Sequence, residues 1–228
     1  MVKGEIVMSR VINITLDGPG GSGKTTVAKS LAGKLGYLYV DTGAMYRAVA
    51  YYMLGHGIAV DDVVGVNANL DKVNLDLKIV DGEQRVILNG EDISDRIRTQ
   101  EISMGASTVS KIKEVRLKLV AMQRELANKY DSIFDGRDMG SFVLPNADHK
   151  FYVTADVDVR AKRRYLELKA KGMDAELKKV KEEMIARDEQ DSSRAFAPLV
   201  IPQGAYVIDT SNMSIEEVEN IILKKVRK

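Results

Sequence analysis

A glycine-rich stretch near the start of the chain has the residues to bind a nucleoside triphosphate. It runs Gly18-Pro19-Gly20-Gly21-Ser22-Gly23-Lys24-Thr25 and matches the phosphate-loop spacing of a glycine, any four residues and then Gly-Lys-Thr. Glycines let the backbone turn so that successive N–H groups converge on a phosphate at a helix N-terminus. Lys24 supplies a positive charge for the outer phosphates, and the Thr25 hydroxyl is a candidate ligand of Mg²⁺. The residues expected to hold ATP are Gly18, Gly20, Gly21, Ser22, Gly23, Lys24, Thr25 and Thr26.

Arginines are the expected companions of such a loop, because phosphoryl transfer depends mostly on positioning and on stabilising negative charge. Their planar guanidinium groups donate two parallel hydrogen bonds to phosphate oxygens and stay charged. The candidates lie near predicted strand ends and in two helices: Arg47, Arg137, Arg160, Arg163, Arg164, Arg187 and Arg194. For Arg187, Asp191 and Arg194 there is an alternative to phosphate binding: an ordinary Arg–Asp ion pair on a solvent-exposed helix. The phosphate loop favours a lid over the transferring phosphates instead.

Asp135 ends an apolar run and opens the charged sequence Asp135-Gly-Arg-Asp138. Charged residues at the carboxyl end of a buried strand are more often functional than simply exposed at the surface. If its strand neighbours the first one, Asp135 lies beside the phosphate loop. Two roles stay open there: Asp135 holds a water on Mg²⁺, or it forms an ion pair with Lys24 or an arginine.

The elements that must position these residues follow an alternating pattern of strands and helices. Short buried strands are predicted at 11–16, 37–40, 132–135, 150–153 and 206–209. Helices follow the first two strands and end near Gly36 and Gly55. This order predicts an α/β fold with a five-stranded parallel sheet, whose ligands bind at the carboxyl ends of the strands.

Residues 61–98 interrupt that pattern and are predicted to form a small insert. Strand-like runs and turn signals alternate in this segment: 75–80, Asp81-Gly82, 85–88, Asn89-Gly90 and 91–93. They describe an antiparallel meander with too few large apolar residues to fold alone, so it should pack on the core. The core itself is predicted to comprise residues 9–60 and 99–228.

The helical segments after the insert carry further candidates. Ser107 and Arg116 are nine positions apart, which puts them on opposite faces of a continuous helix. If both face one ligand, the helix must break between them, and Ser110 is a candidate cap of the second piece. Two charged helices separated at Gly172 make residues 155–198 the predicted lid. Ser214 and Glu217 form a capping box for the closing helix.

Composition excludes several classes of protein. The chain has 228 residues, a formal net charge of +1, no cysteine and two histidines. Disulfides, thiolate metal sites and cysteine nucleophiles are therefore excluded, and no global positive charge is available to hold nucleic acid or an anionic membrane. We expect a cytoplasmic monomer that acts on small molecules and binds neither nucleic acid nor membrane.

Five stretches together resemble bacterial cytidylate kinase, a P-loop nucleoside monophosphate kinase. They cover nearly the whole chain in the family's order: Asp17-Gly-Pro-Gly-Gly-Ser-Gly-Lys-Thr25, Asp41-Thr-Gly-Ala-Met-Tyr-Arg47, Ile97-Arg-Thr-Gln-Glu101, Asp135-Gly-Arg-Asp-Met-Gly140 and Arg194-Ala-Phe-Ala-Pro-Leu199. The resemblance implies transfer of the γ-phosphate of ATP to CMP or dCMP, giving ADP and CDP or dCDP. It also implies a P-loop core, a helical lid and an insert that binds the nucleoside monophosphate.

The resemblance also implies roles for individual residues. The phosphate of the acceptor is expected to bind Thr42, Arg47 and Arg137. The cytosine base is expected to contact Ser107, Arg116 and Asp138. The sugar is expected to contact Arg187 and Asp191. Arg194, with Arg160 and Arg164, would stabilise the transferring phosphoryl group. The candidate catalytic residues are therefore Lys24, Arg137, Arg187 and Arg194, and the candidate metal ligands are Thr25 and Asp135.

Cytosine recognition by these residue types is chemically sound. Cytosine presents an amine donor beside two acceptors, and a carboxylate with an arginine complements that edge. Uracil reverses the upper two groups, so Asp138 would face an oxygen.

Three alternatives remain to be weighed. A kinase for UMP, another nucleotide or a shikimate-like acceptor could use the same core, but the insert of about 38 residues is larger than such kinases usually carry. A GTP-hydrolysing switch needs an Asn-Lys-x-Asp segment after a late strand, and the sequence lacks one. A nucleic-acid-binding ATPase is disfavoured by the near-neutral charge.

Overall fold

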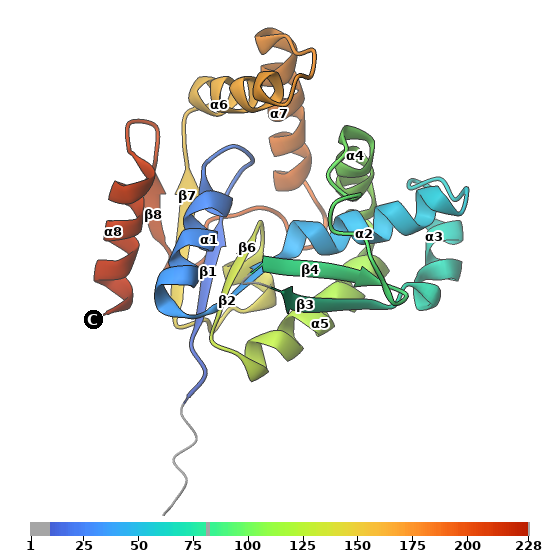
Figure 1. Cartoon of the computed structure of the whole chain (residues 1–228), viewed down its shortest axis with the longest axis horizontal. Coiled ribbons are helices and arrows are strands. Elements are labelled where there is room, and N and C mark those ends of the chain that lie inside the picture. The colour runs from blue at the N-terminus through green and yellow to red at the C-terminus, as the bar shows by residue number, and fades with distance from the viewer. Residues whose placement is uncertain (1–9, 81–82, 228) are drawn as a thin grey trace, which may run out of the picture.

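A five-stranded parallel sheet lies at the centre of the computed structural model, which describes residues 10–80 and 83–227 (Figure 1). Its strands stand in the order β2-β6-β1-β7-β8, and all four pairings are parallel. Their bounds are β1 (Asn13–Asp17), β2 (Leu38–Asp41), β6 (Ser132–Gly136), β7 (His149–Thr154) and β8 (Tyr206–Asp209). The predicted α/β fold and its five strands are confirmed, and β6 does neighbour β1.

Helices cover both faces of the sheet, which explains why its strands read as apolar runs. On β6, Ile133 packs on the side of α1 (Lys24–Leu35) and α8 (Ile215–Val226), whereas Phe134 packs on the side of α5 (Lys113–Lys129). Neighbouring residues of a strand point to opposite faces, so two buried apolar residues in succession require two covered faces.

Local capping sets the ends of several helices. α1 ends at Gly36, whose φ of 70° is left-handed. The side chain of Asp41 accepts a hydrogen bond from the Ala44 amide at the start of α2 (Thr42–Gly55). The capping box predicted from Ser214 and Glu217 is present at the start of α8.

The helical region after the insert breaks, as the positions of Ser107 and Arg116 require. α4 (Gln100–Val109) ends before Ser110, and α5 begins after Ile112. The role predicted for Ser110 is wrong, however. Its φ of −68° and ψ of −9° are helical, and it is the C-cap residue of α4. The N-cap of α5 would need an extended backbone, which Ser110 does not have.

The insert packs on the core, as its sparse apolar content predicts. β3 (Leu75–Val80), β4 (Glu83–Leu88) and β5 (Glu91–Asp92) form an antiparallel sheet, whereas α3 (Val63–Asn69) and the 3₁₀ turn η1 (Leu70–Lys72) were not predicted. The buried side chains of this segment join the cluster around α2: Val66, Leu70, Val73, Val86, Leu88, Ile93 and Ile97. The turn at Asn89-Gly90 has the positive φ angles of a tight turn, whereas Asp81-Gly82 lies outside the described residues.

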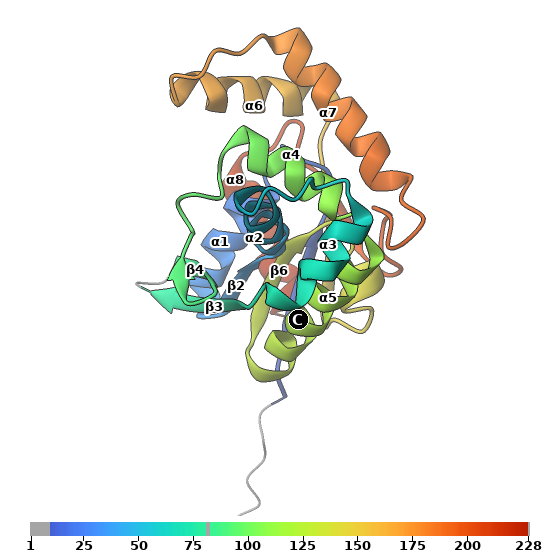
Figure 2. The same cartoon turned by 90° about the vertical axis from the view of Figure 1, so that its right-hand side faces the viewer.

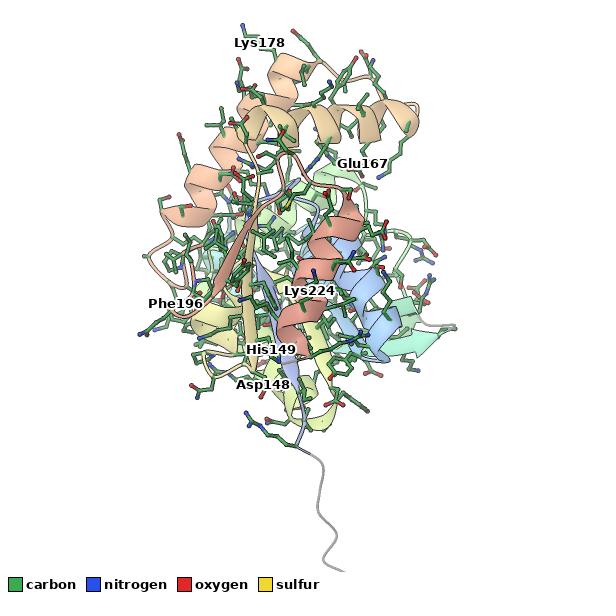
Figure 3. The ribbon with its side chains drawn as sticks, turned by 90° about the vertical axis from the view of Figure 1, so that its left-hand side faces the viewer. Asp148, His149, Glu167, Lys178, Phe196 and Lys224 are labelled. Atoms are coloured by element: carbon green, nitrogen blue, oxygen red, sulfur yellow. The ribbon has the colours of Figure 1, made fainter. Side chains whose placement is uncertain are left out.

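Two helices project beyond the carboxyl ends of the strands. α6 (Val157–Ala170) and α7 (Leu177–Ser192) are joined by a loop that contains Gly172, and both lie above α4 in Figure 2. Figure 3 shows Glu167 and Lys178 at this end, whereas Asp148 and His149 lie at the opposite end of β7. The predicted lid helices therefore stand over the edge where ligands of a parallel sheet bind. Among the described residues, no helix is long and apolar enough to cross a membrane.

Candidate active site

A cavity of 240 Å³ opens at the carboxyl ends of β1, β2 and β6 and is bounded by α2, α4 and α7. Most of the predicted site residues line it: Gly20, Gly21, Lys24, Thr25, Thr42, Arg47, Ser107, Arg116, Asp135, Arg137, Asp138, Arg187, Asp191 and Arg194. Others lie outside its wall: Gly18, Ser22, Gly23, Thr26, Arg160 and Arg164. Residues from both ends of the sequence thus converge on one site.

The phosphate loop starts against β7. Gly18 has a φ of 144°, and a Cβ atom there would stand 2.0 Å from the carbonyl oxygen of Val153, so only glycine fits. Lys24 Nζ donates to the carbonyl oxygen of Pro19 at 2.9 Å. Burial lowers the pKa of Lys24 to about 7, and repulsion from Arg137 adds to the effect. The ammonium group therefore gains most when negative charge enters the loop.

Thr25 and Asp135 meet beside Lys24. The Thr25 hydroxyl donates to Asp135 Oδ2 at 2.5 Å, and Asp135 Oδ1 lies 3.9 Å from Lys24 Nζ. The ion pair with Lys24 is thus present, and the carboxylate is also next to the predicted metal ligand. No group of three acidic or histidine side chains that could hold a metal exists among the described residues. The two oxygens fit Mg²⁺, which binds through few carboxylates together with phosphates and water.

The acceptor side of the cavity is held by hydrogen bonds between elements. Thr42 Oγ1 donates to the carbonyl oxygen of Asp135 at 2.8 Å. Arg47 pairs with Asp41 at 2.9 Å, and its Nε is buried without a partner among the described residues. A buried donor of this kind is costly unless a ligand accepts from it.

Asp191 holds two arginines of the cavity. Its carboxylate pairs with Arg137 at 3.1 Å and with Arg194, and its side chain is 2% exposed. Burial alone would raise the pKa of Asp191, but Arg137 and Arg194 hold it below its usual value. Arg187 lines the same cavity and makes no hydrogen bond or ion pair within residues 10–80 and 83–227.

A buried ion pair between Arg116 and Asp138 closes the far end of the cavity. The side chains are 1% and 3% exposed. The Arg116 guanidinium lies 5.5 Å from the centre of the Tyr46 ring. Within the described chain, the Tyr46 hydroxyl and the Nε atoms of Arg116 and Arg194 are buried and unpartnered. This end therefore offers several polar atoms to a ligand.

The three arginines of α6 point in different directions. Arg160 donates to the carbonyl oxygen of Gly20 at 3.2 Å and pairs with Asp188 at 2.6 Å. Arg163 donates to Thr210, and Arg164 pairs with Glu167 at the surface. Only Arg160 of the three contacts the phosphate loop in this structure.

Sequence reasoning gave no role to Asp17, which is fully buried at the end of β1. Its two carboxylate oxygens accept hydrogen bonds from the Met139 and Gly140 amides, both at 2.7 Å. These amides open the short π-helix η2 (Met139–Val143), directly after Asp138. Burial raises the pKa of Asp17 to about 7 despite the two donors. We call this arrangement the Asp17 clamp.

Tyr46 was also left without a role. It lies inside the stretch Asp41-Thr-Gly-Ala-Met-Tyr-Arg47, but its spacing from the other apolar residues of the predicted helix is typical of an ordinary core residue. Only the structure shows its ring 5.5 Å from the Arg116 guanidinium and its hydroxyl buried without a partner among the described residues.

The family model described as "Cytidylate kinase" matches residues 14–228. A protein named cytidylate kinase from Caldicellulosiruptor bescii is 49% identical over 93% of this chain and 94% of its own length. Another protein of that name, from Shouchella clausii, is 44% identical over 96% of this chain and 98% of its own length.

A solved structure supports the fold alone. An uncharacterized protein from Eubacterium ventriosum aligns with a TM-score of 0.55 at 14% identity, over 95% of this chain and 99% of that one. The match of the family model and the identity to these relatives extend over nearly all of the sequence, including every stretch that lines the cavity. The chain therefore belongs to the cytidylate kinase family.

Proposed function

We propose that this protein transfers the γ-phosphoryl group of ATP to CMP or dCMP and releases ADP with CDP or dCDP. The observation that carries the proposal is a single cavity with Lys24 of the phosphate loop at one end and the buried Arg116–Asp138 pair at the other. The relatives named cytidylate kinase support it.

ATP would bind through the backbone N–H groups of the phosphate loop. Lys24 would leave Pro19 and pair with the outer phosphates, and Arg160 is near enough to the loop to assist. Thr25 and Asp135 would hold Mg²⁺, which when bound neutralises charge on the β- and γ-phosphates.

CMP would bind with its phosphate among Thr42, Arg47 and Arg137. The unpartnered Nε of Arg47 supports this assignment. Arg187 and Asp191 would contact the sugar. Asp138 would accept from the cytosine amine, and Arg116 and Ser107 would donate to the two acceptors of the ring, O2 and N3.

Transfer then needs positioning and charge. An oxygen of the CMP phosphate attacks the γ-phosphorus while its bond to the bridging oxygen of ADP breaks, and that oxygen keeps the electron pair. Lys24, Arg137, Arg187 and Arg194 would stabilise the charge that spreads over the phosphoryl oxygens. Ion pairing with Asp191 holds Arg137 and Arg194 close together before any substrate arrives.

We extend the proposal to the parts of the molecule. Residues 61–98 would be the insert that faces the acceptor nucleotide, and residues 155–198 the lid. The contact of the insert with α2 supports the first assignment, because α2 carries Arg47. We further propose that the protein is a monomer in the cytoplasm.

A coupled assay of ADP release tests the activity. Purified protein with ATP and Mg²⁺ is offered CMP, dCMP, UMP, AMP, GMP and shikimate, each in turn. CMP and dCMP should give the highest kcat/KM, and Lys24→Ala should abolish turnover while the protein still melts cooperatively. Faster turnover of UMP or another acceptor would replace this proposal with a P-loop kinase for that acceptor.

A further inference from the structure

The last turn of α7 reaches the end of the cavity that we assign to the base. Gln190 Nε2 lies 3.0 Å from the carbonyl oxygen of Ser107 and 2.7 Å from its hydroxyl oxygen. A carbonyl oxygen can only accept hydrogen bonds, so the amide atom that faces it is the NH₂ group. The second amide hydrogen is then donated to the Ser107 hydroxyl oxygen.

This contact decides whether the Ser107 hydroxyl acts as a hydrogen-bond donor or as an acceptor towards a ligand. Its oxygen already accepts from Gln190, so its own hydrogen must point elsewhere. Residues 10–80 and 83–227 contain no acceptor bonded to that hydrogen, and Ser107 lines the cavity. Polar hydrogens in partly buried sites find partners, so this one is available to water or to a ligand acceptor in the cavity.

Other hydrogen bonds fix Ser107 from the opposite side. Ser110 Oγ donates to the Ser107 carbonyl oxygen at 2.8 Å, and Arg116 Nη1 donates to the Ser110 carbonyl oxygen at 3.2 Å. Arg116 in turn pairs with Asp138. An unbroken path of hydrogen bonds therefore connects α7 with the buried ion pair.

We infer that Gln190 is a positioning residue that makes Ser107 a hydrogen-bond donor and thereby favours cytosine over uracil. The inference rests on the proposed function. N3 of cytosine is an acceptor, whereas N3 of uracil carries a hydrogen. A serine locked as a donor pairs with the first and opposes the second. A serine free of Gln190 can rotate its hydroxyl and accept from uracil.

Calorimetric titration of CMP and UMP into the full-length protein tests this inference. Gln190→Met keeps the length of the side chain and removes both hydrogen bonds. It should raise the Kd for CMP by about 3- to 10-fold, because the Ser107 hydroxyl is no longer held as a donor to the base. The Kd for UMP should stay unchanged or fall. Glu189→Met, at an exposed neighbouring position, is the matched control and should leave both constants unchanged.

Two further variants sharpen the test. Gln190→Glu keeps the shape but accepts from Ser107, so it should reduce the preference for CMP at least as much, and it serves if Gln190→Met does not fold. In a Ser107→Ala background, Gln190→Met should not change the preference further. An unchanged ratio of the two Kd values, or equal weakening of CMP and UMP, overturns the inference.

The two proposals fail in different ways. A wild-type protein that prefers CMP in binding but does not phosphorylate it contradicts the proposed activity alone. A wild-type protein that phosphorylates CMP but binds CMP and UMP equally contradicts the role of Gln190 alone.

Discussion

Lys24 is a buried ammonium group whose pKa lies near neutrality. Its pKa of about 7 in the free protein results from burial first and from Arg137 second. Bound ATP adds negative charge and raises that pKa. At pH 8, Lys24 is therefore mostly neutral before binding and charged afterwards, so ATP binding should take up close to one proton. At pH 6 the group is already charged, and the uptake should approach zero.

Calorimetry in buffers of different ionisation enthalpy measures this uptake. Lys24→Met removes the titrating group and should abolish the difference between pH 8 and pH 6. The same uptake at both pH values in the wild-type protein would contradict the assignment to Lys24.

Asp138 gives a second prediction at the scale of single residues. Asp138→Ala would strand the Arg116 charge in a buried site, so Asp138→Asn is the sharper variant. Loss of a hydrogen bond to a charged acceptor should lower kcat/KM for CMP by about 10- to 100-fold. UMP should lose less, because an amide can turn its NH₂ group towards the uracil oxygen. Equal losses for CMP and UMP would mean that Asp138 only holds Arg116.

The sequence predicts well which residues meet at the site, and poorly how they are held. Lys24 and Asp138 belong to stretches with a recognisable order, and the ends of β1 and β6 bring them together, whereas Arg116 reaches the cavity from α5. Asp17 and Gln190 each act through two hydrogen bonds to residues far away in the chain. No local pattern marks such contacts, because they depend on how the elements pack.

At the scale of elements, the Asp17 clamp joins the end of β1 to the start of η2. The pKa of Asp17 is about 7, above the usual value of 3.8 for an aspartate, so the folded state binds a proton more tightly than the unfolded state. The stabilisation that this proton gives is complete below pH 4 and is lost as the pH rises to 7. Relative to Asp17→Asn, the free energy of unfolding should fall by up to about 4 kcal/mol over that window.

Denaturant unfolding of both proteins at several pH values between 4 and 8 provides the measurement. The difference between them should change below pH 7 and flatten above it. A difference that does not depend on pH would exclude an elevated pKa for Asp17.

Most elements of the fold follow from local signals. The apolar strands and the caps at Gly36 and Ser214 appear where the sequence places them. α3 was not predicted because Val63 and Val64 point to solvent and give no apolar stripe. Its one signal is Asp62, whose side chain caps the helix by accepting from Gly65. The first amides of η2 bond to the distant Asp17, and no local sequence signal predicts this short helix.

At the scale of the molecule, α6 and α7 project beyond the carboxyl ends of the strands (Figure 2). Hydrogen bonds of Arg160 and Arg163 hold the start of α6 to the core, and contacts of Gln190 and Asp191 hold the last turn of α7. We expect residues 155–198 to be open and mobile without nucleotides and to close over ATP and CMP, which excludes water from the γ-phosphate. Hydrogen exchange should show increased protection across this segment when analogues of ATP and CMP bind together. An unchanged profile in the doubly bound protein would count against a moving lid, and the sheet strands serve as the internal reference.

The order of the strands also has a consequence for how the protein is made. β1 pairs with β6 and β7, so Asn13 can pair with Ser132, the first residue of β6, only after that part of the chain has been synthesised. At a synthesis rate of about 5–20 residues per second, roughly 6 to 24 seconds pass before that partner has been translated. During this time the apolar strand that carries the phosphate loop has neither of its neighbours. Chaperones that bind extended apolar segments should therefore meet the nascent chain first at β1.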